Sequence, residues 1–224
     1  MRVKLLKFTN DPEKTCAAAA RLCYSGAGID EIEKKLTKEK IKGLLNQIIS
    51  SGHHSVLEHV SFSFFADGVS RALLAQLTRH RIASFSVQSQ RYVKYDDGLT
   101  FIVPASIKNN KKAFDKYKEF LNACNDLYKY FLNEEIPAED ARYILPNAAP
   151  TKIFFTMNAR ELRHFFSIRC CNRAQWEIKE MACAMLNLVK KKAPIIFFDA
   201  GPECLRTKCQ ESKSCGKPWK KRGL

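Results

Sequence analysis

The sequence predicts an α+β fold, in which helices flank a mixed β-sheet. Apolar residues recur at helical spacing in several segments and at a spacing of two in others, and the two kinds of segment alternate along the chain. The 224 residues, 46% of them hydrophobic, are enough to bury one substantial core. A doubly wound Rossmann sheet is not expected. The segment Gly26-Ala27-Gly28 lacks the third glycine of a dinucleotide fingerprint, and the chain has no phosphate-binding GxxxxGK loop.

The first half of the chain alternates strands and helices. Pro12 follows two good capping residues, Asn10 and Asp11, and therefore marks the first turn of a helix. Further on, Phe62 and Phe64 stand opposite serines, which is the alternation of a half-buried strand. The predicted elements of this half are a strand at 3–8, helices at 11–24 and 37–51, a strand at 60–65 and a helix at 69–78.

The second half is mostly helical. Pro137 and the acids after it open a short helix, and Asn158 can cap another. The last helix carries one apolar stripe and is closed by a lysine run and Pro194. The predicted elements of this half are helices at 113–132 and 137–145, a buried strand at 152–156, and helices at 158–168 and 174–189.

The charge of the chain indicates an anionic partner. The formal net charge is +15, which favours phosphorylated ligands, nucleic acid or a membrane surface without choosing among them. The basic first residues run directly into polar ones, so a signal peptide is not expected, and no apolar stretch of roughly twenty residues occurs. We therefore expect a cytoplasmic protein.

The nine cysteines favour free thiols. An odd number of cysteines in a chain expected in the cytosol argues against a disulfide framework. Cys16, Cys23, Cys124 and Cys183 lie in helix-like segments, and we expect them in the core.

Three more cysteines stand in a basic tail. We expect a single domain at residues 1–203 and a tail at 204–224 that carries Cys204, Cys209 and Cys215. Zinc sites usually need four ligands, and the tail offers three thiolates. No metal site is therefore predicted, because a fourth ligand would have to come from elsewhere in the chain.

The run RHRIASFSVQSQRY at residues 79–92 is the strongest functional signal. It contains three arginines, a histidine and three serines, but no acid. Arginine matches phosphate oxygens with two parallel donors, and serine hydroxyls can complete the shell around an anion. The alternative is a solvated basic helix face, but such faces usually mix charges of both signs. The run predicts a phosphate-binding site.

This run and three further segments resemble the flavin-dependent thymidylate synthases. The further segments are HHSVLEH at 53–59, ARYILP at 141–146, and NARELRHF at 158–165 followed by AQWE at 174–177. The resemblance covers most of residues 1–200. It implies the fold peculiar to that family and a homotetramer with active sites between subunits.

The resemblance also implies the reaction. In this family dUMP is methylated to dTMP, with 5,10-methylenetetrahydrofolate as the carbon donor, reduced FAD as the hydride donor and NADPH as the reductant of the flavin. The hydride chemistry belongs to the flavin, and the protein supplies orientation and electrostatics. Neither nucleic acid nor a membrane is then an expected partner.

The resemblance assigns residues to each ligand. Arg91 and Arg142 are the expected phosphate partners, and Arg169 is the expected catalytic residue, because a guanidinium fixed at the uracil ring makes the ring more enolate-like. His53 is expected near the folate and flavin rings. The residues implied around dUMP are Gln76, Leu77, Thr78, Arg79, Val87, Gln88, Ser89, Gln90, Arg91, Arg142 and Arg169. The residues implied around FAD are Ser55, Arg79, His80, Arg81, Val87, Asn158, Ala159, Arg160 and His164.

The chain departs from the family pattern at four positions. Ser86 and Val87 replace an Asn and a Glu that many members carry, so only backbone contacts are expected from Val87. His164 stands where an amide is common, and Arg173 where a histidine occurs. Ser89 has no evident base beside it, and we assign it to substrate binding rather than to nucleophilic catalysis.

Two other classes of function remain open at this point. Arginines and tyrosines near residues 91–95 could form a nucleic-acid-binding groove. The group His53, His54, Glu58 and His59 could serve a metal-dependent hydrolase, although no completing ligand pattern is evident. Bound flavin would distinguish the synthase from both alternatives, because neither a nucleic-acid-binding protein nor a hydrolase of this kind is expected to bind flavin.

Overall fold

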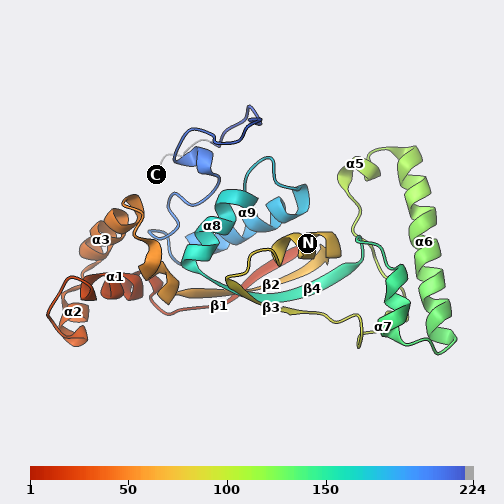
Figure 1. Ribbon diagram of the computed structural model, residues 1–224, viewed down its shortest axis with the longest axis horizontal. Coiled ribbons are helices and arrows are strands. Elements are labelled where there is room, and N and C mark those ends of the chain that lie inside the picture. Colours follow the sequence, from red (N-terminus) through yellow and green to blue (C-terminus); the bar gives the residue numbers. More distant parts are fainter. Residues whose placement is uncertain (220–224) are drawn as a thin grey trace. The chain divides into compact units, whose positions relative to one another are not determined.

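The computed structural model describes residues 1–219 (Figure 1). The predicted tail ends in residues 220–224, which lie outside the described residues. The chain forms two compact units, each assembled from separate stretches of sequence. Unit 1 comprises Met1–Arg2, Ala66–Arg79 and Ser86–Phe154. Unit 2 comprises Val3–Phe65, His80–Phe85 and Phe155–Leu224.

Four strands form one antiparallel sheet, which confirms the predicted α+β class. The strand order is β1 (Arg2–Phe8), β2 (Ser61–Ser70), β4 (Pro150–Asn158) and β3 (Ala83–Val87). The pairing of β1 with β2 includes the bond from the Thr9 amide to the Ser61 carbonyl, at 3.0 Å. Each pair of neighbouring strands is antiparallel, so the sheet differs from the parallel sheet of a Rossmann fold.

Unit 2 has a core of aromatic side chains beneath two helices. Phe62 and Phe64 of β2 are fully buried, as their alternation with serines predicts. The Phe62 ring lies 5.4 Å from that of Phe197, and Phe64 stacks on Phe155 of β4. The helices α8 (Ala159–Arg169) and α9 (Trp176–Lys190) lie over this part of the sheet (Figure 1).

The remaining helices of unit 2 are short. They are α1 (Pro12–Leu22), α2 (Ile29–Lys35), α3 (Lys38–Ser50) and the 3-10 helices η1 (His54–His59) and η3 (Glu203–Leu205). Sequence reasoning missed α2 because Ile32 is its one buried side chain, which leaves no apolar stripe to detect. Asp11 occupies the cap position of α1, but with φ at 43° its side chain makes no capping hydrogen bond within residues 1–219.

Unit 1 is dominated by a long helix. Its helices are α4 (Arg71–Leu77), α5 (Ala105–Lys108), α6 (Lys111–Asn133), α7 (Ala138–Ala141) and the 3-10 helix η2 (Arg142–Ile144). The side chain of Asn125 on α6 clamps the preceding loop, because it accepts the Leu99 amide at 3.0 Å and donates to the Leu99 carbonyl at 3.1 Å.

Three sequence predictions need correction. The helix expected from residue 69 begins at Arg71, because β2 continues to Ser70, whose hydroxyl then caps the helix. The strand expected to be wholly buried, β4, instead alternates buried and more exposed positions. Cys23 is exposed rather than in the core, because it follows the last turn of α1, and Cys183 is only partly buried, whereas Cys16 and Cys124 are buried as expected.

No helix within residues 1–219 is both long and apolar enough to cross a membrane.

Candidate functional site

Unit 2 contains a polar cavity with a volume of about 580 Å³. Ligand pockets in proteins usually measure roughly 300–1,000 Å³, so the cavity is large enough for a small organic ligand. Three residues predicted to hold FAD lie in its wall, namely Asn158, Arg160 and His164. The full lining comprises His54, Glu58, Ile82, Asn158, Arg160, Glu161, Arg163, His164, Ser167 and Arg206.

The first turn of α8 faces this cavity. Asn158 caps the helix, because its Oδ1 accepts the Glu161 amide at 2.8 Å, and its amide nitrogen is then the group it can offer to a ligand. Arg160 forms an ion pair with Glu58 of η1. The start of an 11-residue helix with arginines beside it suits an anionic group such as a phosphate.

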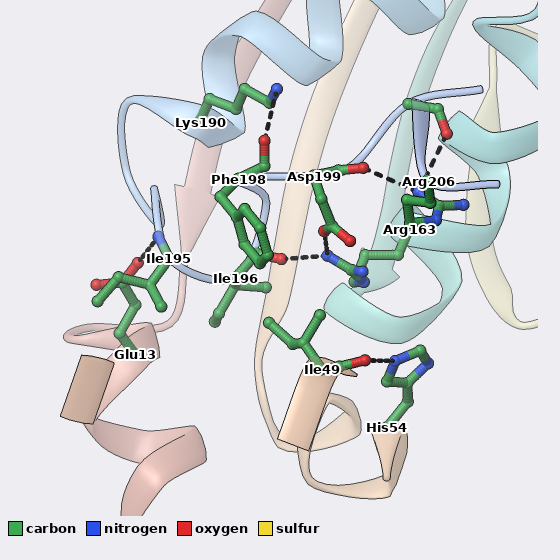
Figure 2. A network of polar contacts seen from close by, with 11 residues as sticks. Glu13, Ile49, His54, Arg163, Lys190, Ile195, Ile196, Phe198, Asp199 and Arg206 are labelled. Carbon is green, nitrogen blue, oxygen red and sulfur yellow. Dashed lines mark hydrogen bonds and ion pairs between the residues drawn. The ribbon is translucent and has the colours of Figure 1, made fainter. Parts of the chain in front are cut away.

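Two further arginines of the cavity wall, Arg163 and Arg206, both bind Asp199 (Figure 2). Arg163 of α8 donates to Asp199 Oδ1 at 2.7 Å and to the Ile196 carbonyl at 2.6 Å. Arg206 donates to the backbone carbonyl of the same Asp199 at 2.9 Å. These contacts join α8 to the segment after α9, so that two cations from distant stretches of sequence border one cavity.

The three consecutive basic residues Arg79, His80 and Arg81 differ in burial. Arg79 and Arg81 are exposed, whereas His80 is only 6% exposed and lies against α8. Its Nδ1 lies 2.8 Å from Glu161 Oε1, and its Nε2 accepts a hydrogen bond from Arg169 Nε at 3.1 Å. Because Nε2 accepts, the proton of a neutral ring is on Nδ1 and is donated to Glu161. The ring thus orients Arg169, rather than offering its nitrogens to a ligand in the cavity.

The pKa of His80 is lowered from its ordinary value, chiefly because burial disfavours the charged ring. The positive charge of Arg169 adds to this effect, and the hydrogen bond to Glu161 opposes it. A neutral ring is therefore the form that the fold stabilises at neutral pH.

The free energy of unfolding should consequently fall as the pH drops below about 6.5, the ordinary pKa of histidine, because the unfolded chain then binds a proton that the folded chain does not. The contribution of His80 has a slope of at most about 1.4 kcal/mol per pH unit. Urea unfolding between about pH 5 and 8 measures it. The variant His80→Asn should lose this contribution to the pH dependence of the free energy of unfolding. The control variant His59→Asn, which alters an exposed histidine, should keep it. Equal slopes in all three proteins would contradict the assignment.

Unit 1 brings the two predicted phosphate arginines together. Arg91 Nε donates to Glu139 Oε2 at 2.7 Å, and Arg142 Nε donates to the backbone carbonyl of Glu139 at 3.0 Å. Glu139 of α7 therefore accepts hydrogen bonds from both guanidinium groups, although Arg91 and Arg142 are 51 positions apart in the sequence. Glu139 was not among the predicted residues, because a glutamate in a short acidic helix start carries no distinctive signal.

Arg71 is a third cation beside this pair. Its Nη2 donates to the Gln88 carbonyl at 2.8 Å. Its pKa is lowered, first by burial and also by the positive charge of Arg142, whereas Tyr95 opposes the shift. Arg71 Nε and the Nε2 of the buried Gln90 have no hydrogen-bond partner within residues 1–219. The described residues therefore leave hydrogen-bonding capacity of Arg71 and Gln90 unused.

The predicted residues thus fall into two sets. Apart from Arg169, all the residues expected at dUMP belong to unit 1, and apart from Arg79 and Val87, all those expected at FAD belong to unit 2. His53 and Ser55 are exposed on η1 and its cap, outside the lining of the cavity. The amide of Ala159 is engaged by the Val60 carbonyl at 2.9 Å. Sequence reasoning missed five residues that line the cavity or orient Arg169, namely Ile82, Glu161, Arg163, Ser167 and Arg206.

Two of the four residues of the hydrolase alternative already have other partners. Glu58 is paired with Arg160, and His54 Nε2 lies 3.3 Å from the Ile49 carbonyl. Burial also lowers the pKa of His54. These contacts give His54 and Glu58 structural roles at the cavity rim.

Comparisons with known proteins point to one family. Residues 4–195 match the family model described as thymidylate synthase complementing protein. The flavin-dependent thymidylate synthase of Geobacter sulfurreducens is 53% identical over 219 residues, which span 97% of this chain and 94% of the relative. That of Clostridium tetani is 49% identical over 234 residues, with 97% and 94% covered. That of Pyrococcus furiosus is 42% identical over 213 residues, with 92% and 87% covered.

Proposed function

The chain belongs to the thymidylate synthase complementing family, the flavin-dependent thymidylate synthases, and from this membership we propose how its residues share the reaction. The enzyme methylates dUMP to dTMP, with 5,10-methylenetetrahydrofolate as the carbon donor. FAD, reduced by NADPH, supplies the hydride.

The cavity of unit 2 is the proposed FAD site, and its lining is the single observation that carries the proposal. The volume, the start of α8 and the cations around it fit a ligand that is both bulky and anionic. Asn158, Arg160 and His164 would hold the cofactor. Arg206 and Arg163 would add positive charge to the same wall.

The cluster of unit 1 is the proposed site of the dUMP phosphate. Glu139 fixes the Nε side of Arg91 and Arg142, and a guanidinium has further N–H donors for a phosphate. Arg71 lies in the same unit and adds a third positive charge, which supports the assignment. Gln88 and Ser89 would complete the binding of the nucleotide.

Arg169 is the proposed catalytic residue. A guanidinium against the uracil ring stabilises negative charge on that ring, and C5 becomes a better nucleophile. His80 and Glu161 fix the plane of the guanidinium, since Arg169 Nε donates to His80. Fixed donors contribute more to a transition state than mobile ones, because they need no reorganisation during the reaction.

The assembly and cellular location follow from family membership as proposals. We assign a homotetramer with active sites between subunits, which acts in the cytoplasm. The synthase domain is assigned to residues 1–203.

The FAD assignment is tested with Arg160→Ala. Loss of one charged hydrogen-bond partner should weaken FAD binding by about 1.5–3 kcal/mol, or roughly 10–150-fold in Kd. Quenching of flavin fluorescence during titration measures the Kd. The control is Arg21→Ala, which removes an exposed arginine from α1 of the same unit.

Unchanged affinity in Arg160→Ala would overturn the assignment of the cavity. A wild-type protein that retains no flavin after desalting, and whose flavin is not reduced by NADPH, would instead support a nucleic-acid-binding or hydrolase function.

A further inference from the structure

A second, much smaller cavity in unit 2 is lined by four cysteines. Its volume is about 20 Å³. Cys171, Cys204, Cys209 and Cys215 all border it, and all four are free thiols. Three of them are the tail cysteines, and the fold adds Cys171 from the turn between α8 and α9. The fourth ligand that the tail itself lacks is therefore supplied from residues far earlier in the sequence.

The tail is tied to the turn that carries Cys171. Asn172 donates to the Lys217 carbonyl at 2.8 Å, and its Nδ2 lies 3.9 Å from Cys215 Sγ. Arg173 donates to the Lys213 carbonyl and forms an ion pair with Glu211 at 3.5 Å. The two residues next to Cys171 thus hold both sides of the loop that leads to Cys215.

The backbone at Cys215 favours a thiolate at this position. Gly216 has φ at 66°, a conformation that glycine adopts without strain, and the Lys217 amide then donates to Cys215 Sγ at 3.4 Å. Amide donors and the side chain of Asn172 stabilise negative charge on sulfur. Arg173 adds a positive charge beside the same group of residues.

We propose that Cys171, Cys204, Cys209 and Cys215 bind one zinc ion as a structural site. Four thiolates are a common ligand set for tetrahedral zinc, and soft sulfur ligands select zinc over magnesium or calcium. A space of about 20 Å³ suits a single ion rather than an iron–sulfur cluster. Lys208, Lys213 and Lys217 of the tail carry positive charge that offsets part of the negative charge of the four thiolates.

Binding would also move the sulfurs. Within residues 1–219, no three or more His, Cys, Asp or Glu side chains already stand as a metal centre. The ion therefore draws the four thiolates to about 2.3 Å from itself, the usual Zn–S distance. Cys209 and Cys215 lie in the loops of the tail, and Cys204 lies on the short 3-10 helix η3.

The site would fix the segment that lines the larger cavity. Arg206 stands between Cys204 and Cys209 in the sequence and reaches Asp199. A metal that anchors both cysteines would hold Arg206 in the wall of the larger cavity. The zinc proposal itself does not depend on which ligand occupies that cavity.

The first test uses the wild-type full chain. Metal is removed with a chelator under reducing conditions, and Co²⁺ is then titrated. Intense visible d–d bands and a sulfur-to-cobalt charge-transfer band are expected, saturating at one ion per chain. Elemental analysis of protein purified without chelator should give one zinc per chain. Absence of both signals would overturn the proposal, as would iron with labile sulfide or a disulfide among the four cysteines.

Variants then assign the ligands. Cys171→Ser and Cys209→Ser should lose the bound zinc, while the matched control Cys23→Ser, which alters an exposed cysteine of α1, should keep it. Circular dichroism shows whether each variant is folded. Equal zinc content in folded Cys171→Ser and Cys23→Ser would overturn the assignment of Cys171. FAD binding, measured on the same samples, separates this outcome from a failure of the proposed function.

Discussion

Arg169→Ala should reduce the rate of dTMP formation about 10²–10³-fold, the loss seen when one fixed donor to a transition-state charge is removed. FAD should remain bound, because Arg169 is outside the lining of the larger cavity. The rate is measured in single turnovers with flavin that has been reduced beforehand, so that reduction by NADPH does not limit it. Arg169 also makes its contact with His80, and loss of that contact is a structural effect that must be separated from catalysis.

Two further variants make that separation. Arg169→Lys keeps the positive charge but loses the planar fork, and its rate should recover only in part. His80→Asn leaves Arg169 in place but removes its orienting partner, and the rate should fall less than in Arg169→Ala. If Arg169→Ala turns over at the wild-type rate, the assignment of Arg169 as the catalytic residue is wrong.

Arg142→Ala should raise the KM for dUMP by roughly 10–150-fold, which corresponds to about 1.5–3 kcal/mol for a hydrogen bond to a charged group. The rate at saturating dUMP should change much less, because the phosphate is remote from the ring that reacts. Arg91→Ala should behave in the same way. Since Glu139 holds both arginines, the effects of the two substitutions should not be additive.

The matched control is the nucleoside deoxyuridine, which has no phosphate. Its weak binding should be the same in the wild type and in Arg142→Ala. Glu139→Gln retains the shape of the side chain but loses the ion pair with Arg91, and it should raise the KM by a smaller factor. An equal loss of affinity for dUMP and deoxyuridine would show that Arg142 does not recognise the phosphate.

Local sequence patterns predicted most elements of the fold. Asn158 caps α8 as expected, and the helix predicted at 37–51 forms with Thr37 as its cap. The alternation at Phe62 and Phe64 marked a strand correctly. The class of fold is confirmed, and so is family membership. Periodicity could not reveal α2, because a short exposed helix has no buried face.

The site was harder to predict because its contacts join distant stretches. The sequence marked His80 as a basic residue in a phosphate-binding run, but it does not show that folding buries the ring between Glu161 and Arg169. Arg206 carried no signal at all, because a basic tail offers many similar residues. Likewise, three tail cysteines gave an incomplete ligand set until the fold placed Cys171 beside them. Roles that depend on such long-range partners need the tertiary structure.

The interleaved order of the two units has a consequence for how the protein folds. Unit 2 draws on three stretches of the chain, and its strand β2 must wait for β4 and α8, which are made about ninety residues later. Most of unit 1 is continuous, from Ser86 to Phe154, and this stretch is made before the third stretch of unit 2. Closing the long loops of unit 2 costs chain entropy before its core contacts form. Most of unit 1 can therefore fold while the third stretch of unit 2 is still being made, and the aromatic core of unit 2 can form only after Phe155 and Phe197 have been added.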